Sequence, residues 1–149
     1  MTIVTNDGHE GTLEVIKYID DSLYNFLYNL YNDNLLNSTT IFLLSDHGTA
    51  APSLYYLSNF YKIERNLPML NMIINDRKNI SYKQQYEFIH KNQQILVTGY
   101  DIYNTIGNLV FGDEYYLIQN KSTIKDTPKT KLGISLFNKI NPIICYSRM

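Results

Sequence analysis

The stretch Thr40-Ile41-Phe42-Leu43-Leu44-Ser45-Asp46-His47-Gly48 decides the fold. Its first half is a continuous apolar run without alternation, which is typical of a strand covered on both faces. Its second half is polar and ends in glycine, so the strand is expected to stop at Leu44. In α/β sheets, ligands bind where strands end and the backbone leaves the sheet. The stretch therefore predicts a covered strand over residues 40–44, followed by a turn at a candidate binding edge.

The segments around this strand predict the layers of an α/β domain. Apolar residues recur at three- and four-residue spacing from Thr12 to Tyr31, which predicts an amphipathic helix that the polar residues 32–34 end. Residues 67–74 are again largely apolar and predict a second covered strand. A helix followed by covered strands favours an α/β fold whose sheet is mainly parallel.

Two further segments bear on the site and on the core. The connection from Thr49 to Arg65 carries Tyr55, Tyr56, Phe60 and Tyr61, and it is either a loop with a short helix or an aromatic flap over a site. Both alternatives stay open. Farther along, Thr98 and Asp101 have the spacing of a capping box, which predicts a packed helix after Thr98.

Composition limits the classes of protein to which the chain can belong. Its 149 residues are 44% hydrophobic, enough for one compact domain over residues 1–149. A formal net charge of -1 disfavours nucleic acid as a partner. No apolar run approaches the roughly 18 residues of a membrane-spanning helix. Cys145 is the only cysteine, which excludes an internal disulfide and leaves the compartment undecided.

The candidate chemistry lies in Asp46 and His47. A carboxylate oxygen and an imidazole nitrogen that leave a strand together can bind one divalent cation, and the histidine favours zinc or manganese over calcium. The alternative is that Asp46 caps the next segment and His47 only hydrogen-bonds a loop. His9, in the run Asp7-Gly8-His9-Glu10, is a second candidate ligand, and its alternative is a solvated histidine near a chain end.

Several blocks, taken in order, resemble the alkaline phosphatase superfamily, and more narrowly the sulfatase-like DUF229 group. The blocks are His9-Glu10-Gly11-Thr12, Tyr18-Ile19-Asp20, Ser45-Asp46-His47-Gly48, Glu64-Arg65-Asn66-Leu67-Pro68, Asn92 with residues 96–105, and Gly133-Ile134-Ser135-Leu136-Phe137. The resemblance covers nearly the whole chain. It implies an alkaline-phosphatase-like (sulfatase-like) α/β fold with a mainly parallel sheet flanked by helices. It also implies hydrolysis of phosphoric or sulfuric esters with one or two divalent metal ions.

The resemblance also implies roles for individual residues. Asp46 and His47 match the pair that binds the metal shared with the nucleophile, and His9 matches a ligand of a second metal. Thr98 and Asp101 match a structural block behind the site. Thr5 stands where phosphodiesterase relatives have an aspartate, four residues before the matched histidine. Relatives are often secretory or membrane-associated.

No residue matches the nucleophile or the first metal-binding aspartate of the family, so no catalytic residue is predicted. The chain is expected to be the incomplete C-terminal part of such a hydrolase, inactive alone and partnered by a missing N-terminal part. One alternative is a noncatalytic remnant or binding module that contacts a partner through Tyr55 to Tyr61. Another is a phosphoethanolamine-transferase-like enzyme, although no His-Gly-Gly block follows the tetrad Ser45–Gly48. The sequence does not choose between sulfate and phosphate.

Overall fold

The computed structural model describes residues 1–6, 14–48, 56–74, 83–112 and 133–140. The chain separates into two compact units, Met1–Arg77 and Lys78–Met149, and each is described by itself. The expectation of one domain over residues 1–149 stays a prediction, because two units of this kind can belong to one domain.

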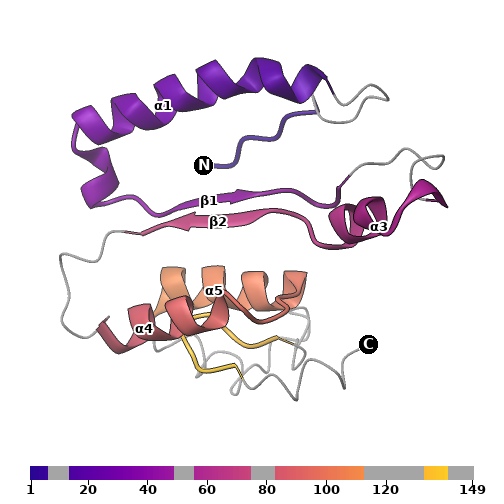
Figure 1. The fold of residues 1–149 in the computed structure, drawn as a ribbon. Coiled ribbons are helices and arrows are strands. Elements are labelled where there is room, and N and C mark those ends of the chain that lie inside the picture. Colours follow the sequence, from indigo (N-terminus) through magenta and orange to yellow (C-terminus); the bar gives the residue numbers. More distant parts are fainter. Residues whose placement is uncertain (7–13, 49–55, 75–82, 113–132, 141–149) are drawn as a thin grey trace, which may run out of the picture. The chain divides into compact units, whose positions relative to one another are not determined.

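The first unit contains helices and a pair of strands (Figure 1). In chain order, its elements are η1 (Val15–Ile19), α1 (Asp20–Asn32), η2 (Leu35–Asn37), β1 (Ile41–Leu44), α3 (Asn59–Asn66) and β2 (Leu70–Ile73). Together, η1 and α1 confirm the amphipathic helix over the described part of its predicted range. Its predicted start at Thr12 lies outside the described residues. The helix ends as predicted, because Asp33 follows α1 and Asn34 takes a left-handed conformation with φ of 58°.

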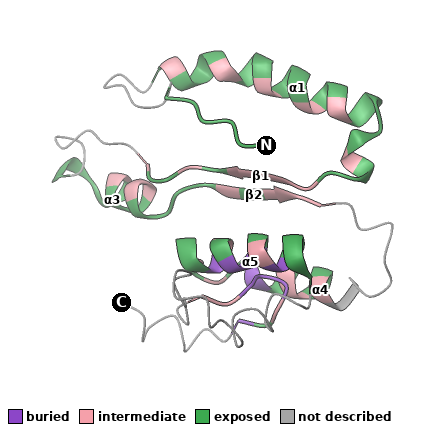
Figure 2. Ribbon diagram, turned by 180° about the vertical axis from the view of Figure 1, so that it is seen from behind, coloured by how far each residue is buried: buried purple, intermediate pink, exposed green. Residues whose placement is uncertain are grey.

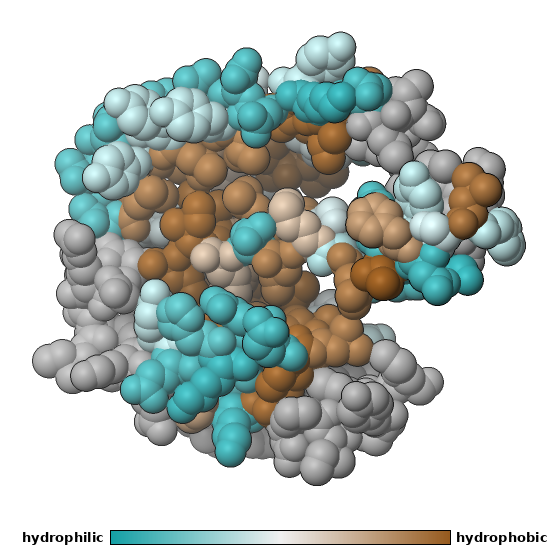
Figure 3. Space-filling model, viewed as in Figure 1, coloured by the Kyte–Doolittle hydropathy of each residue, from teal (hydrophilic) through white to brown (hydrophobic). Residues whose placement is uncertain are grey.

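Helix α1 runs alongside the two strands and is amphipathic (Figure 1). Its half-buried side chains are Leu23, Leu27 and Leu30, which share one face of the helix. Figure 3 shows hydrophobic residues gathered beneath α1 and hydrophilic residues along its outer side. These leucines of the predicted apolar stripe therefore face the interior of this unit, whereas Ile16 and Phe26 of the same stripe are exposed.

The two strands pair antiparallel, with Ile41 opposite Ile73 and Leu44 opposite Leu70. This pair is therefore antiparallel, whereas the sheet was expected to be mainly parallel. The reason lies in the connection, which leaves β1 and enters β2 at the same end of the pair and so makes no crossover. The alkaline-phosphatase-like sheet as a whole involves more than these strands and stays a prediction.

Burial of β1 is also less complete than the apolar run suggested. Ile41, Phe42 and Leu43 are half-buried, and Leu44 is 49% exposed. The connection after β1 contains the eight-residue helix α3, which confirms the alternative of a loop with a short helix within the described residues.

The second unit is built on α4 (Lys83–Asn92) and α5 (Gly99–Phe111). Helix α5 begins after Thr98, as the sequence predicted. The Asp101 carboxylate accepts hydrogen bonds from the Thr98 backbone N–H at 2.8 Å and from its hydroxyl at 2.7 Å. The bond from the Thr98 N–H satisfies a backbone donor that has no acceptor within the helix.

The buried residues of the described chain lie in the second unit (Figure 2). The apolar ones are Leu136, Phe137 and Ile140, and the polar ones are Asn92, Asp101, Asn104, Thr105, Asn108 and Ser135. The apolar side of α5 was expected to pack, yet Tyr103, Ile106 and Val110 are exposed. The buried face of α5 is therefore a polar one. Among the described helices, we find none with the length and apolar character that crossing a membrane requires.

Candidate metal centre

The turn that follows β1 is held at both of its ends. At one end, Ser45 donates its backbone N–H to the Met69 carbonyl at 3.1 Å, and Met69 donates its N–H to Ser45 Oγ at 3.3 Å. At the other end, Gly48 donates its N–H to the carbonyl of Arg65, in the last turn of α3, at 3.2 Å. Asp46 and His47 therefore lie between two residues whose backbones are held by hydrogen bonds. The hydroxyl of Ser45 extends the strand pairing, which is a structural role.

The side chains of Asp46 and His47 come together. Asp46 Oδ2 lies 3.6 Å from His47 Nε2, and Asp46 Oδ1 accepts the His47 backbone N–H at 2.9 Å. The other ring nitrogen, His47 Nδ1, lies 2.6 Å from the Gly48 carbonyl oxygen. Because a carbonyl only accepts hydrogen bonds, Nδ1 carries the proton of the neutral ring. The lone pair is then on Nε2, beside the carboxylate.

This arrangement fits two ligands of one cation. Nitrogen and oxygen ligands lie about 2.0–2.2 Å from zinc, so two atoms that bind the same ion are at most about 4.4 Å apart. The 3.6 Å separation of Asp46 Oδ2 and His47 Nε2 satisfies this limit. The Asp46 side chain is 87% exposed and that of His47 is 40% exposed, so an ion can reach both. Within the described ranges, no cluster of three or more His, Cys, Asp or Glu residues is present.

Three other residues with potential ligand side chains are His9, Asp20 and His90. His9 lies outside the described residues. Asp20 is exposed at the start of α1. His90 is exposed on α4, where its ring meets the Tyr86 ring edge-to-face at 4.9 Å between centroids.

Sequence reasoning missed what Gly48 does. A side chain at Gly48 has no room, because a Cβ there would lie 2.1 Å from the Glu64 carbonyl oxygen and 2.9 Å from the Arg65 Cα. The glycine therefore permits close approach to the main chain of α3, in addition to the turn expected from it. The available signal was the block Glu64–Pro68, which the structure brings against the block Ser45–Gly48.

The second unit brings together two more of the sequence blocks, Asn92 with residues 96–105 and residues 133–137. Asp101 Oδ1 accepts the Ile134 N–H at 2.7 Å. The Thr105 hydroxyl donates to the Asp101 carbonyl at 2.6 Å and accepts the Leu136 N–H at 2.9 Å. Asn92 Nδ2 donates to the carbonyls of Leu136 and Asn138 at 3.0 and 2.8 Å. These side chains bind main-chain groups, so the cluster has the structural role that the resemblance implied for Asp101.

Comparison with known proteins gives one match. A family model described as a protein of unknown function (DUF229) matches residues 2–145. The chain belongs to the DUF229 family. The match spans both units and confirms the group to which the sequence blocks pointed. No curated protein and no solved structure matches the chain.

Proposed function

We propose that this DUF229 chain supplies metal ligands to a divalent-metal-dependent hydrolase of phosphoric or sulfuric esters, of the sulfatase-like type within the alkaline phosphatase superfamily. The observation that supports the proposal most directly is the 3.6 Å approach of Asp46 Oδ2 to His47 Nε2 beyond the end of β1. The resemblance of the ordered sequence blocks supports the superfamily and its fold. His9 is proposed as a ligand of a second metal on that resemblance alone.

Each residue of the turn has a defined part in the proposed site. Asp46 supplies an anionic oxygen, and His47 supplies Nε2 of a neutral ring. The Gly48 carbonyl oxygen accepts a hydrogen bond from the Nδ1–H of His47 at 2.6 Å, which leaves Nε2 as the nitrogen that can face a cation. A bound divalent cation would stabilise the negative charge that develops on the ester oxygens during hydrolysis. No residue of this chain matches the family's nucleophile, so the proposal assigns none.

Metal binding by the full chain tests the proposal. Titration calorimetry with zinc and with manganese would compare the wild type with Asp46→Asn and His47→Gln. Each substitution removes a direct ligand, so the affinity should fall by more than the roughly 10- to 100-fold that loss of an outer hydrogen-bond partner costs. Asp33→Asn and His90→Gln are matched controls on exposed residues outside the turn, and they should bind as the wild type does. Equal affinity in Asp46→Asn and the wild type would remove the proposed site.

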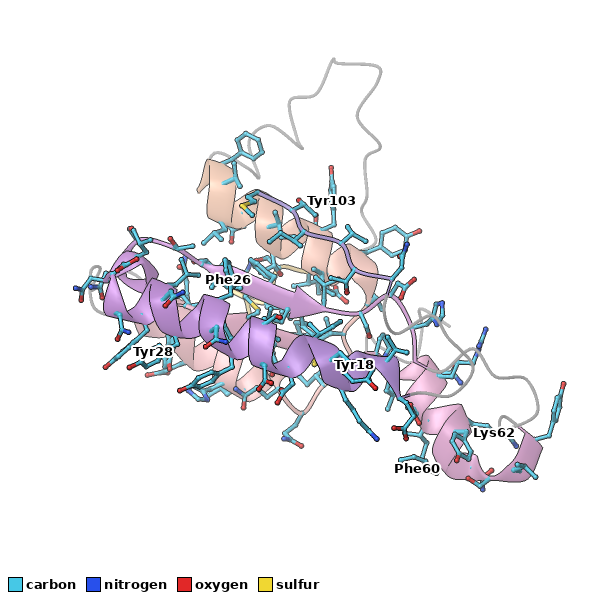
Figure 4. All side chains as sticks on the ribbon, turned by 90° about the horizontal axis from the view of Figure 1, so that it is seen from above. Tyr18, Phe26, Tyr28, Phe60, Lys62 and Tyr103 are labelled. Atoms are coloured by element: carbon cyan, nitrogen blue, oxygen red, sulfur yellow. The ribbon has the colours of Figure 1, made fainter. Side chains whose placement is uncertain are left out.

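The aromatic segment supports a second candidate, a noncatalytic binding module. Tyr56, Leu57 and Phe60 are 83%, 72% and 68% exposed. Phe60 contacts the Tyr61 ring edge-to-face at 5.7 Å between centroids, and its side chain projects from α3 (Figure 4). Exposed aromatic side chains of this kind are suited to a protein contact. Ester hydrolysis by the 149-residue chain, lost in Asp46→Asn, would exclude a purely noncatalytic role.

A further inference from the structure

We propose that the last turn of α3 positions His47 for metal binding, and that it does so through Gly48. This inference rests on the proposed function, because it assigns a positioning element to the same site. The main chain of Glu64 and Arg65 forms the supporting wall, and the Gly48 carbonyl carries its effect to the imidazole ring. Neither Glu64 nor Arg65 needs its side chain for this role.

Contact between Gly48 and α3 is close and specific. The Gly48 N–H bonds to the Arg65 carbonyl at 3.2 Å. The space in which a Cβ would stand is taken by the Glu64 carbonyl, 2.1 Å from the Cβ position. A helix main chain cannot yield as the far end of a flexible side chain can, so the fit requires glycine.

The helix end that forms the wall is itself fixed. Leu67 donates its N–H to the Ile63 carbonyl at 2.8 Å, which closes the last turn of α3. Two residues farther on, Met69 exchanges two hydrogen bonds with Ser45. The turn Ser45–Gly48 is therefore tied at its first residue to the start of β2 and at its last residue to α3.

These ties set the direction in which His47 can bind a cation. With its N–H bonded to Arg65, Gly48 has restricted freedom, and its carbonyl oxygen stays 2.6 Å from His47 Nδ1. That bond selects the tautomer with the proton on Nδ1 and fixes the orientation of the ring. The wall on α3 thus holds the ring with Nε2 3.6 Å from Asp46 Oδ2.

The first measurement uses the wild-type chain without metal. Long-range proton–nitrogen NMR in alkaline solution, where histidine side chains are neutral, reports which ring nitrogen bears the proton. We expect the proton on Nδ1 of His47, and protection of the Gly48 amide from hydrogen exchange. A ring protonated on Nε2, or an unprotected Gly48 amide, overturns the inference even if metal binds.

The second measurement compares Gly48→Ala with Gly99→Ala. Gly99 is the matched control, because a Cβ there has no heavy atom within 4 Å. We expect Gly48→Ala to lower zinc affinity by about 10-fold or more and to produce a mixture of His47 tautomers, and Gly99→Ala to change neither. Unchanged affinity and tautomer in Gly48→Ala overturn the inference. Should that variant fail to fold, the wild-type NMR result decides.

The two proposals fail in different ways. If Asp46→Asn and His47→Gln bind zinc as tightly as the wild type, the proposed function fails and the inference fails with it. If those two variants lose zinc but Gly48→Ala keeps the wild-type affinity and tautomer, only the positioning role of α3 is lost.

Discussion

The carboxylate of Asp101 accepts the backbone N–H of Ile134, 33 residues later in the chain, at 2.7 Å. The same carboxylate, 2% exposed as a residue, also accepts two hydrogen bonds from Thr98. One side chain therefore both caps α5 and holds the segment 133–140 against it. In a sheet, pairing with a neighbouring strand would satisfy the backbone N–H and C=O groups of such a segment. Here, polar side chains of α5 and α4 form hydrogen bonds with these groups.

Replacing Asp101 by alanine should destabilise the second unit by about 3 kcal/mol. The substitution leaves the half-buried Ile134 N–H without its acceptor and removes the cap of α5. Amide hydrogen exchange at Ile134, measured by NMR, would report the loss as faster exchange. Asp33→Ala, at an exposed carboxylate in the first unit, should leave this exchange rate unchanged. Equal protection of Ile134 in the wild type and Asp101→Ala would contradict the bond.

Thr105→Val tests the hydroxyl bridge between α5 and Leu136. Thr105 is fully buried, and valine keeps its shape while removing the group that donates to the Asp101 carbonyl and accepts from Leu136. Leaving the Leu136 N–H unsatisfied should cost about 1–3 kcal/mol, measured by urea unfolding. Thr105→Ser keeps the hydroxyl and should lose less. A larger loss in the serine variant than in the valine variant would mean that methyl packing is the main contribution.

Alanine should have different effects at Gly99, the first residue of α5, and at Gly112, the residue after its last. Gly112 ends the helix with φ of 60° and ψ of -147°, a combination that only glycine adopts without strain. Gly112→Ala should therefore destabilise the chain by about 1–3 kcal/mol, although the space around its Cβ is open. Gly99→Ala, at the first residue of the helix, should be neutral or stabilise the chain by up to about 1 kcal/mol. Thermal unfolding of the two variants measures whether each change in stability has the expected sign. A Gly112→Ala variant more stable than the wild type would contradict the positive φ of Gly112.

Local sequence patterns predicted the elements that depend on neighbouring residues. Apolar spacing identified α1, and the pair Thr98 and Asp101 identified the start of α5. The direction in which the two strands pair could not be predicted, because an apolar run records burial and carries no information on the strand that pairs with it. The antiparallel direction is defined by contacts between residues far apart in the chain, such as Ile41 opposite Ile73 and Leu44 opposite Leu70.

The polar core and the contacts that support the candidate site could be recognised only in the folded structure. Asp101, Thr105 and Asn108 have the spacing of one helix face, but polar side chains normally indicate a solvated face. Their burial depends on carbonyls and amides supplied by residues 133–140, which a local pattern does not show. In the same way, Asp46 and His47 could be predicted as candidate ligands from the sequence, while the contact of Gly48 with Glu64 could not.

Metal selectivity provides the last prediction. Calcium takes six to eight oxygen ligands, whereas zinc and manganese accept an imidazole nitrogen. The chain should therefore bind zinc and manganese at least about 10-fold more tightly than calcium, because His47 contributes Nε2 beside Asp46. Calorimetric titrations with each ion, made on the wild type and on His47→Asn, measure this preference. Replacing the ring nitrogen by an amide should weaken zinc binding far more than calcium binding. The difference in affinity between the two ions should therefore become smaller. A chain that prefers calcium, or a preference unchanged in His47→Asn, would show that His47 does not bind the ion.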